Sequence, residues 1–131
     1  MARVQEGIAT LSAVLDDSGG RIDRDGQAAL RCELGYGFLQ LGTMEKSRES
    51  LDKSIESYRI ALDRFTPEFN ANDWAGAKSN IGAALVEGSK EESGTSRLFA
   101  AAAHFRDALT VLTPEKFPFQ WAETQSNLGL A

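Results

Sequence analysis

The chain has 131 residues, the length of one ordinary domain, and 42% of them are hydrophobic, which is enough for a buried core. Its 19 acidic and 14 basic side chains give a net charge of −5, which disfavours binding to nucleic acid and to anionic membrane surfaces. The lone cysteine, Cys32, cannot form an intramolecular disulfide, and with one histidine in the chain there is no Cys/His cluster for zinc, so we expect no metal or other cofactor.

The expected location is the cytoplasm, as a soluble protein. Residues 1–20 lack the basic start and the continuous apolar run of a signal peptide. No stretch approaches the roughly 20 apolar residues that a membrane span needs. A chain with a single cysteine also fits a reducing compartment.

Six helices are predicted, because apolar residues recur at intervals of three and four along most of the chain. No segment shows the alternation of a strand, so the predicted fold class is all-α. Connectors rich in Gly, Ser, Thr and charged residues separate the helical segments. The expected helices span residues 2–16, 26–41, 48–65, 73–87, 96–112 and 119–131.

Residues that favour helix ends lie near these boundaries. Asp and Asn side chains accept hydrogen bonds from the first N–H groups of a helix, proline suits the first turn, and glycine commonly ends a helix. We assign helix starts to Asp25, to Asn72 or Asp73, and to Pro118. We expect Gly42 and Gly88 to end the second and fourth helices.

The last third of the chain repeats the middle third at an interval of 47 residues. The stretch DWAGAKSNIGAAL, which begins at Asp73, matches QWAETQSNLGLA, which begins at Gln120. The triplet TPE at Thr66 recurs at Thr113 with the same offset. The first, third and fifth helices also share apolar residues spaced four, three and four apart. A period of this length is typical of repeat architectures.

The first helix of the repeated unit carries an aliphatic residue followed by glycine, and its second helix carries a small residue, an aromatic residue and an alanine at helical spacing. These residues are Leu34-Gly35, Ile81-Gly82 and Leu128-Gly129 in first helices, and Ser54, Tyr58, Ala61 and Ala101, Phe105, Ala108 in second helices. In this combination the repeated unit resembles the tetratricopeptide repeat. The family's usual unit has 34 residues, and the longer unit here is similar to a variety found in bacterial multi-repeat proteins.

The resemblance implies a right-handed superhelix of antiparallel helix hairpins, a TPR-like α-α solenoid. Within it we expect a half unit at residues 1–16, units at 26–65 and 73–112, and a half unit at 119–131. Glycine inside a helix costs about 1 kcal/mol relative to alanine. Its return at Gly35, Gly82 and Gly129 therefore predicts places where two helix backbones approach closely. Trp74 and Trp121 hold equivalent positions, and we interpret them as packing residues rather than ligand contacts.

The resemblance also implies a concave groove lined by the first helices. Asn80 and Asn127 precede two of the repeated glycines although asparagine is a poor helix former. An asparagine there commonly touches a bound peptide backbone in this family, and a hydrogen bond between helices explains it equally well. By spacing from the glycine, the remaining groove residues are Cys32, Tyr36, Leu39, Gln40, Ser79, Ala83, Glu87, Glu123, Ser126 and Leu130.

The expected function is non-enzymatic binding of a protein or peptide, with a regulatory role inside a larger bacterial signalling protein. The groove residues include no lysine or arginine, which family members need to grip a peptide's terminal carboxylate. A mildly apolar and acidic groove suits a neutral, basic or helical partner. His104 aligns with serines in the other units, and no Ser-His-Asp or Cys-His arrangement is defined, so we expect no enzyme activity.

The order of the helices suggests an alternative function. We call the first helix of a unit a first-type helix and its second helix a second-type helix. The predicted order opens on a second-type helix and closes on a first-type helix, whereas the terminal units of a solenoid normally carry a polar cap. We therefore expect either a fragment of a longer array or a chain whose terminal helices pair with another copy. In the latter case the protein is an assembly element that forms a homodimer.

Overall fold

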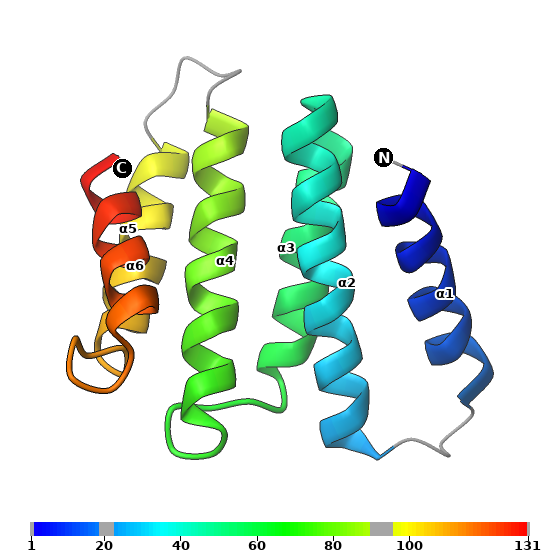
Figure 1. The fold of residues 1–131 in the computed structure, drawn as a ribbon, viewed down its shortest axis with the longest axis horizontal. Coiled ribbons are helices and arrows are strands. Elements are labelled where there is room, and N and C mark those ends of the chain that lie inside the picture. The colour runs from blue at the N-terminus through cyan, green and yellow to red at the C-terminus, as the bar shows by residue number, and fades with distance from the viewer. Residues whose placement is uncertain (1, 19–22, 90–95, 131) are drawn as a thin grey trace. The chain divides into compact units, whose positions relative to one another are not determined.

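The computed structural model describes residues 2–18, 23–89 and 96–130, and the regular structure within these ranges is entirely helical (Figure 1). The prediction of an all-α chain with six helices is therefore confirmed for the described residues. The helices are α1 (Ala2–Ser18), α2 (Arg24–Glu45), α3 (Arg48–Leu62), α4 (Ala71–Ser89), α5 (Ser96–Leu109) and α6 (Pro118–Leu130). Helices α1 to α3 belong to one compact unit, Met1–Phe65, and α4 to α6 belong to a second, Thr66–Ala131.

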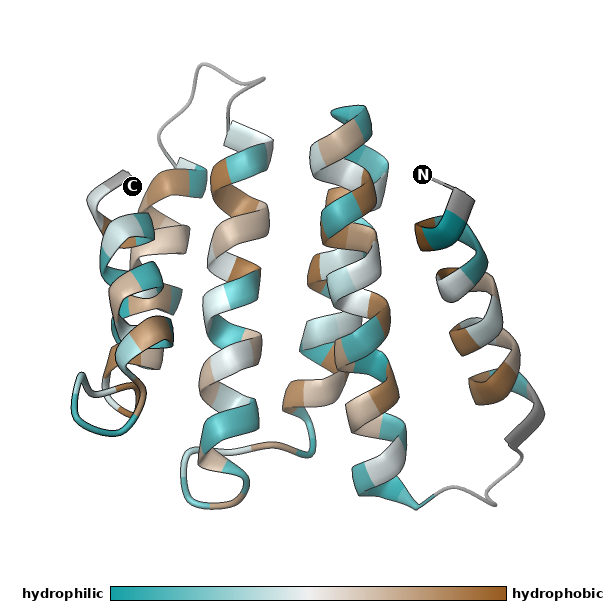
Figure 2. Cartoon of the chain, in the orientation of Figure 1, coloured by the Kyte–Doolittle hydropathy of each residue, from teal (hydrophilic) through white to brown (hydrophobic). Residues whose placement is uncertain are grey.

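In the first unit, α2 and α3 form an antiparallel hairpin and α1 packs on α2. Apolar residues of α1 lie along the side that faces α2 (Figure 2), although Val14 is 40% exposed. One contact of this packing joins Ile8 to Gly37, where an added Cβ would lie 3.0 Å from the Ile8 Cγ1 atom. The half-buried side chains Val4, Ile8 and Leu11 thus follow the apolar spacing seen in the sequence.

In the second unit, α4 and α5 form the equivalent hairpin and α6 packs against both helices. The end of this hairpin holds a core cluster of Ala75, Ala108 and Leu112, all fully buried. Three larger, partly buried side chains pack on the cluster: Trp74, Val111 and Phe117. Burial of these apolar surfaces is the main force that holds α4 and α5 together.

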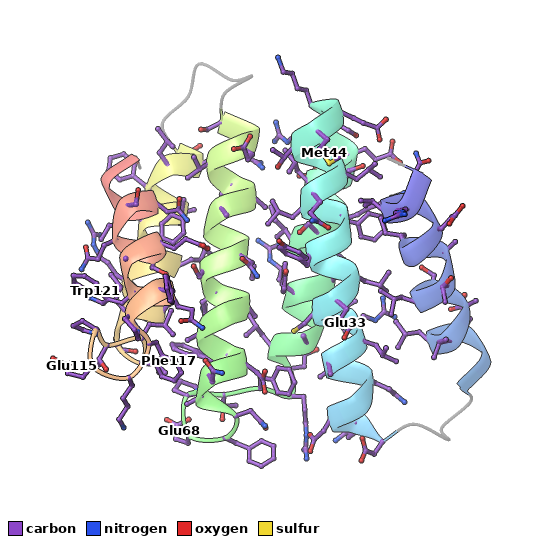
Figure 3. All side chains as sticks on the ribbon, in the orientation of Figure 1. Glu33, Met44, Glu68, Glu115, Phe117 and Trp121 are labelled. Carbon is purple, nitrogen blue, oxygen red and sulfur yellow. The ribbon has the colours of Figure 1, made fainter. Side chains whose placement is uncertain are left out.

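The 47-residue repeat is also present in the hydrogen bonds of the turns that precede α4 and α6. The Phe69 N–H donates to Thr66 Oγ1 at 2.9 Å, and the Lys116 N–H donates to Thr113 Oγ1 at 3.4 Å. Glu68 and Glu115 occupy the same place in these turns (Figure 3). The threonine hydroxyl stabilises both turns by the local side-chain bonding that favours it in such positions.

The helix starts differ from the predictions by two residues. Asp23, not Asp25, caps α2, and its carboxylate accepts a hydrogen bond from the Gly26 N–H at 2.7 Å. Helix α4 begins at Ala71, after Asn70 in the left-handed backbone region at φ 63°, so neither Asn72 nor Asp73 is the residue before it. The assignment of Pro118 to the start of α6 is confirmed.

The glycines expected to end α2 and α4 lie inside these helices. Helix α2 continues to Glu45, and α4 continues past Gly88 to Ser89. A Cβ at Gly42 would lie 2.7 Å from Leu51 Cδ2 and 3.0 Å from the Leu51 backbone nitrogen. The prediction was wrong for Gly42 because this glycine allows α3 to pack closely, whereas α4 ends one residue after Gly88, whose neighbour is the Arg97 guanidinium.

Helix α2 ends instead at Lys46, which adopts the left-handed conformation with φ 53° and ψ 42°. The N–H groups of Lys46 and Ser47 both donate to the Gly42 carbonyl, and the second bond is 2.9 Å long. The Ser47 Oγ then accepts from the Ser50 N–H and caps α3. A two-residue turn therefore ends one helix and begins the next.

Replacing Lys46 with glycine should stabilise the protein. The left-handed conformation costs a residue with a Cβ about 1–2 kcal/mol, and glycine avoids this cost. Glycine also has more freedom to lose on folding, so we expect a net gain of about 0.5–1 kcal/mol in the free energy of unfolding. Urea denaturation measures it, with Lys46→Ala as the control that keeps the Cβ and gains nothing of this kind.

Candidate functional site

Each unit contains a helix glycine covered by an aromatic ring, and we call this pair an aromatic–glycine contact. A Cβ at Gly35 would lie 2.7 Å from Tyr58 Cε2, and a Cβ at Gly82 would lie 2.6 Å from Phe105 Cε1. Both rings are buried. The close approach is thus made by an aromatic side chain from the second helix, rather than by the second backbone that we expected.

A small residue one turn before the aromatic residue completes the contact. In the first unit Ser54 donates a hydrogen bond from Oγ to the Gly35 carbonyl at 2.6 Å, and the pair is buried. Ala101 takes the equivalent place in the second unit and is fully buried. Two different small residues therefore admit the same close packing of helices.

The third repeated glycine has different surroundings. Gly129 is exposed on α6, and no heavy atom of the described residues lies within 4 Å of its Cβ position. The predicted close approach is therefore wrong for Gly129 among the residues that the structure describes. The glycine pattern is the same at all three positions, and the signal of this difference was the order of the helices, which places a second-type helix after Gly35 and Gly82 and predicts none after Gly129.

On α2, three of the four predicted groove residues reach the surface. Tyr36 is 52% exposed, and Cys32 and Gln40 are half-buried one helical turn to either side of it. Leu39 is buried and belongs to the core, so its assignment to the groove was wrong. A leucine at this position adds to the apolar area removed from water.

On α4, Asn80, Ala83 and Glu87 are half-buried, but Ser79 is not available to a ligand. The Ser79 and Thr124 hydroxyl oxygens lie 3.1 Å apart in a buried hydrogen bond that joins α4 to α6. The groove assignment of Ser79 was wrong because this residue, three positions before Gly82, lies on the side of α4 that faces α6. Sequence reasoning missed Thr124 as the partner, since its equivalents are Ala77 and Leu30.

On α6, Glu123 and Ser126 are exposed and Asn127 is half-buried. The side chain of Leu130, the last predicted groove residue, lies outside the described residues. Helix α6 carries no basic residue, so Glu123 is its one charged side chain. Its exposed surface therefore combines polar and weakly acidic groups with one large apolar side chain, Phe119, which is 87% exposed.

The two tryptophans occupy equivalent positions with different surroundings. Trp74 packs on the core cluster at the end of the second hairpin, and Lys78 Nζ lies 5.8 Å from the centre of its ring. Lys78 also forms an ion pair with Asp107 at 3.3 Å. Trp121 is half-buried near the start of α6 (Figure 3).

In the first unit the equivalent apolar residues Ala28, Ala61 and Phe65 are also buried, and an ion pair is added beside them. Arg64 Nε donates a hydrogen bond to Asp25 Oδ1, and this bond raises the pKa of the arginine above its ordinary value. Val111 and Asn72 are the equivalent residues of the second unit. Sequence reasoning missed the pair, because two residues 39 positions apart in an imperfect repeat give no local signal.

The lone histidine and the lone cysteine of the chain lie in different units. His104 is half-buried on α5, and Cys32 lies on α2 in the other unit. Within the described ranges, no group of three or more His, Cys, Asp or Glu side chains could hold a metal ion. The surface residues that the structure offers are thus the aromatic, amide and hydroxyl groups of α2, α4 and α6.

Two broader observations complete the description of these surfaces. No helix in residues 2–18, 23–89 or 96–130 is long and apolar enough to cross a membrane. Comparison with protein-family models, with curated proteins and with solved structures finds no match.

Proposed function

We propose that this chain is a TPR-like binding module that holds a protein or peptide without catalysing a reaction. In this proposal its two units continue one right-handed superhelix in the cytoplasm, and the first-type helices α2, α4 and α6 present the binding surface. The observation that carries the proposal is Tyr36, an aromatic residue that is 52% exposed on α2 next to the buried Gly35.

The chemistry around Tyr36 suits recognition of a peptide. A tyrosine offers a large apolar ring and a hydroxyl while losing little conformational freedom, which is why it is enriched at the centres of interfaces. Cys32 and Gln40 flank it on the same face of α2, and Gln40 adds an amide. In the second unit, Asn80 is half-buried and carries an amide on α4. Amide groups can pair with both the N–H and the C=O of an extended backbone.

The charge of this surface favours some ligands over others. Glu87 on α4 and Glu123 on α6 are its acidic residues, and the whole chain carries a net charge of −5. Complementary charge speeds encounter and excludes partners of like charge. We therefore expect neutral or basic peptides to bind and acidic peptides to be rejected.

The test is selection from a display library of random linear peptides, followed by fluorescence anisotropy with the enriched sequences. Tyr36→Ala and Asn80→Ala should each weaken binding by about tenfold or more, the cost of removing a central contact. If both side chains contact one ligand, the loss of binding free energy in the double variant should differ from the sum of the losses in the two single variants.

Phe99→Ala is the matched control, because Phe99 is a more exposed aromatic residue on the second-type helix α5. It should leave the affinity unchanged. Failure to enrich any peptide, or equal losses for Phe99→Ala and Tyr36→Ala, would contradict the proposed binding surface.

A further inference from the structure

We propose that copies of this chain associate head to tail, with α1 of one copy packed on α6 of the next. In this contact α1 takes the place on α6 that α3 takes on α2 and α5 takes on α4. The inference goes beyond ligand binding, since it involves a different face of α6 and needs no ligand. Four comparisons between equivalent residues carry it.

The first comparison concerns the glycine of α6. Gly35 and Gly82 are buried beneath Tyr58 and Phe105, whereas Gly129 is exposed with no described heavy atom within 4 Å of its Cβ position. Ala122 shows the same difference: it is exposed, although its equivalents in α2 and α4 are buried. Helix α6 therefore retains the surface that receives a second-type helix, and no described helix covers it.

The second comparison concerns the residues of α1 that would enter this surface. Gly7 stands where Ser54 and Ala101 complete the contacts in α3 and α5. Gly7 is exposed and, like Gly129, has no described heavy atom within 4 Å of its Cβ position. Leu11, four residues later, stands where Tyr58 and Phe105 cover their glycines. Helix α1 therefore has the small residue followed by a large apolar residue that a second-type helix needs to pack on α6.

The third comparison shows that the side of α1 that carries Gly7 and Val14 stays exposed when α1 packs on α2. Val14 is 40% exposed, whereas the equivalent Ala61 and Ala108 are 0% exposed because α3 and α5 have a first-type helix beside them. The contact of α1 with α2 uses a different residue, Ile8, which packs on Gly37. One helix can therefore bind α2 of its own chain and α6 of another copy at the same time.

The fourth comparison concerns charge and shape. None of Gly7, Leu11 and Val14 on α1 is charged, and neither is Ala122 or Gly129 on α6, so the contact would desolvate no ion. The α6 surface presents glycine and alanine, and the α1 surface presents leucine and valine. Because the two surfaces differ, the contact is heterologous, and its repetition links copies into a ring or an open chain.

Sedimentation velocity over a range of protein concentrations tests the proposal. The unmodified chain should show a weight-average sedimentation coefficient that rises with concentration above the value of the monomer. Gly129→Leu and Gly7→Leu should each weaken association by about tenfold or more, because they block close approach of the helices. Both substitutions fill open space and improve helix propensity, so thermal unfolding should show that the monomer is not destabilised.

Gly76→Leu is the matched control, since Gly76 lies within α4 and also has no described heavy atom within 4 Å of its Cβ position. It should leave the association unchanged. A mixture of the two blocked variants gives the sharpest result. The Gly129→Leu chain keeps a usable α1 and the Gly7→Leu chain keeps a usable α6, so the mixture should form a heterodimer while each variant alone stays monomeric.

Each other outcome would overturn the proposal. A chain that stays monomeric at the highest concentration does not associate through these helices. Association that survives both Gly129→Leu and Gly7→Leu, or that Gly76→Leu weakens equally, uses a different surface. A mixture of the blocked variants that remains monomeric rules out the heterologous contact.

Discussion

Gly82→Leu is expected to lower the free energy of unfolding by about 3 kcal/mol or more, and the melting temperature by about 10 °C. The first added carbon would already lie 2.6 Å from the Phe105 ring, closer than real side chains approach, and leucine adds three more carbons. Because the ring is fully buried, it has no open space to move into. The gain in helix propensity, about 1 kcal/mol, is too small to offset this overlap.

Thermal and urea denaturation measure the effect, and Gly129→Leu is the control at the equivalent repeat position. It meets no described atom and should leave the melting temperature of the monomer unchanged or slightly higher. If Gly82→Leu does not fold, Gly82→Ala provides a milder test, with a smaller loss. A melting temperature that Gly82→Leu leaves unaltered would refute the packing described for this contact.

Phe105→Ala is expected to cost about 3–5 kcal/mol of unfolding free energy, the usual range for removing a buried phenylalanine. The side chain is 0% exposed and covers Gly82 at the centre of the α4 and α5 hairpin. Its removal leaves a cavity bounded on one side by a glycine, which has no side chain that could move in to fill it.

The control for this substitution lies on the same helix. Phe99 is 76% exposed on α5, so Phe99→Ala loses little packing and should change the free energy of unfolding by less than about 0.5 kcal/mol. The comparison separates burial from the loss of an aromatic residue in a helix. Equal losses for the two variants would show that α5 does not pack in the orientation described.

The helices and the repeat period could be predicted from sequence because their signal is local and redundant. An apolar residue at every third or fourth position fixes both the helix and its buried face, and the same face occurs three times in the chain. The alignment of Gly35 with Gly82, and of Tyr58 with Phe105, placed both partners of each contact in matching helices. The structure was needed only to identify the atoms in contact, because an aromatic ring rather than a second helix backbone packs on each glycine.

The helix ends could not be predicted in the same way. A glycine near the end of an apolar pattern has two physical uses, a left-handed cap or a close contact, and sequence alone does not distinguish them. Gly42 serves the second use against Leu51, and Lys46 takes the left-handed position although it has a Cβ. The choice was made by tertiary packing, which overrides local propensity.

The candidate surface was predicted in outline but not residue by residue. Spacing from the glycine placed Tyr36, Asn80 and Glu123 at least partly in reach of solvent, while it failed at Leu39 and Ser79, which are buried. A spacing rule specifies an angle around one helix axis. Whether another helix covers that angle depends on contacts between segments distant in sequence, such as the Ser79 and Thr124 hydroxyls.

Each hairpin combines a buried apolar end with an ion pair near the surface, and dissolved ions act on these two parts in different ways. The exposed pair of Arg64 and Asp25 is weakened as the ionic strength rises, because mobile ions screen its attraction. Val111, packed with Trp74 and Phe117, carries no charge to screen, and sulfate or phosphate strengthens the burial of such groups. A rise in ionic strength therefore weakens the ion pairs of both hairpins, Arg64 with Asp25 and Lys78 with Asp107, while it leaves their buried apolar ends intact or tightens them.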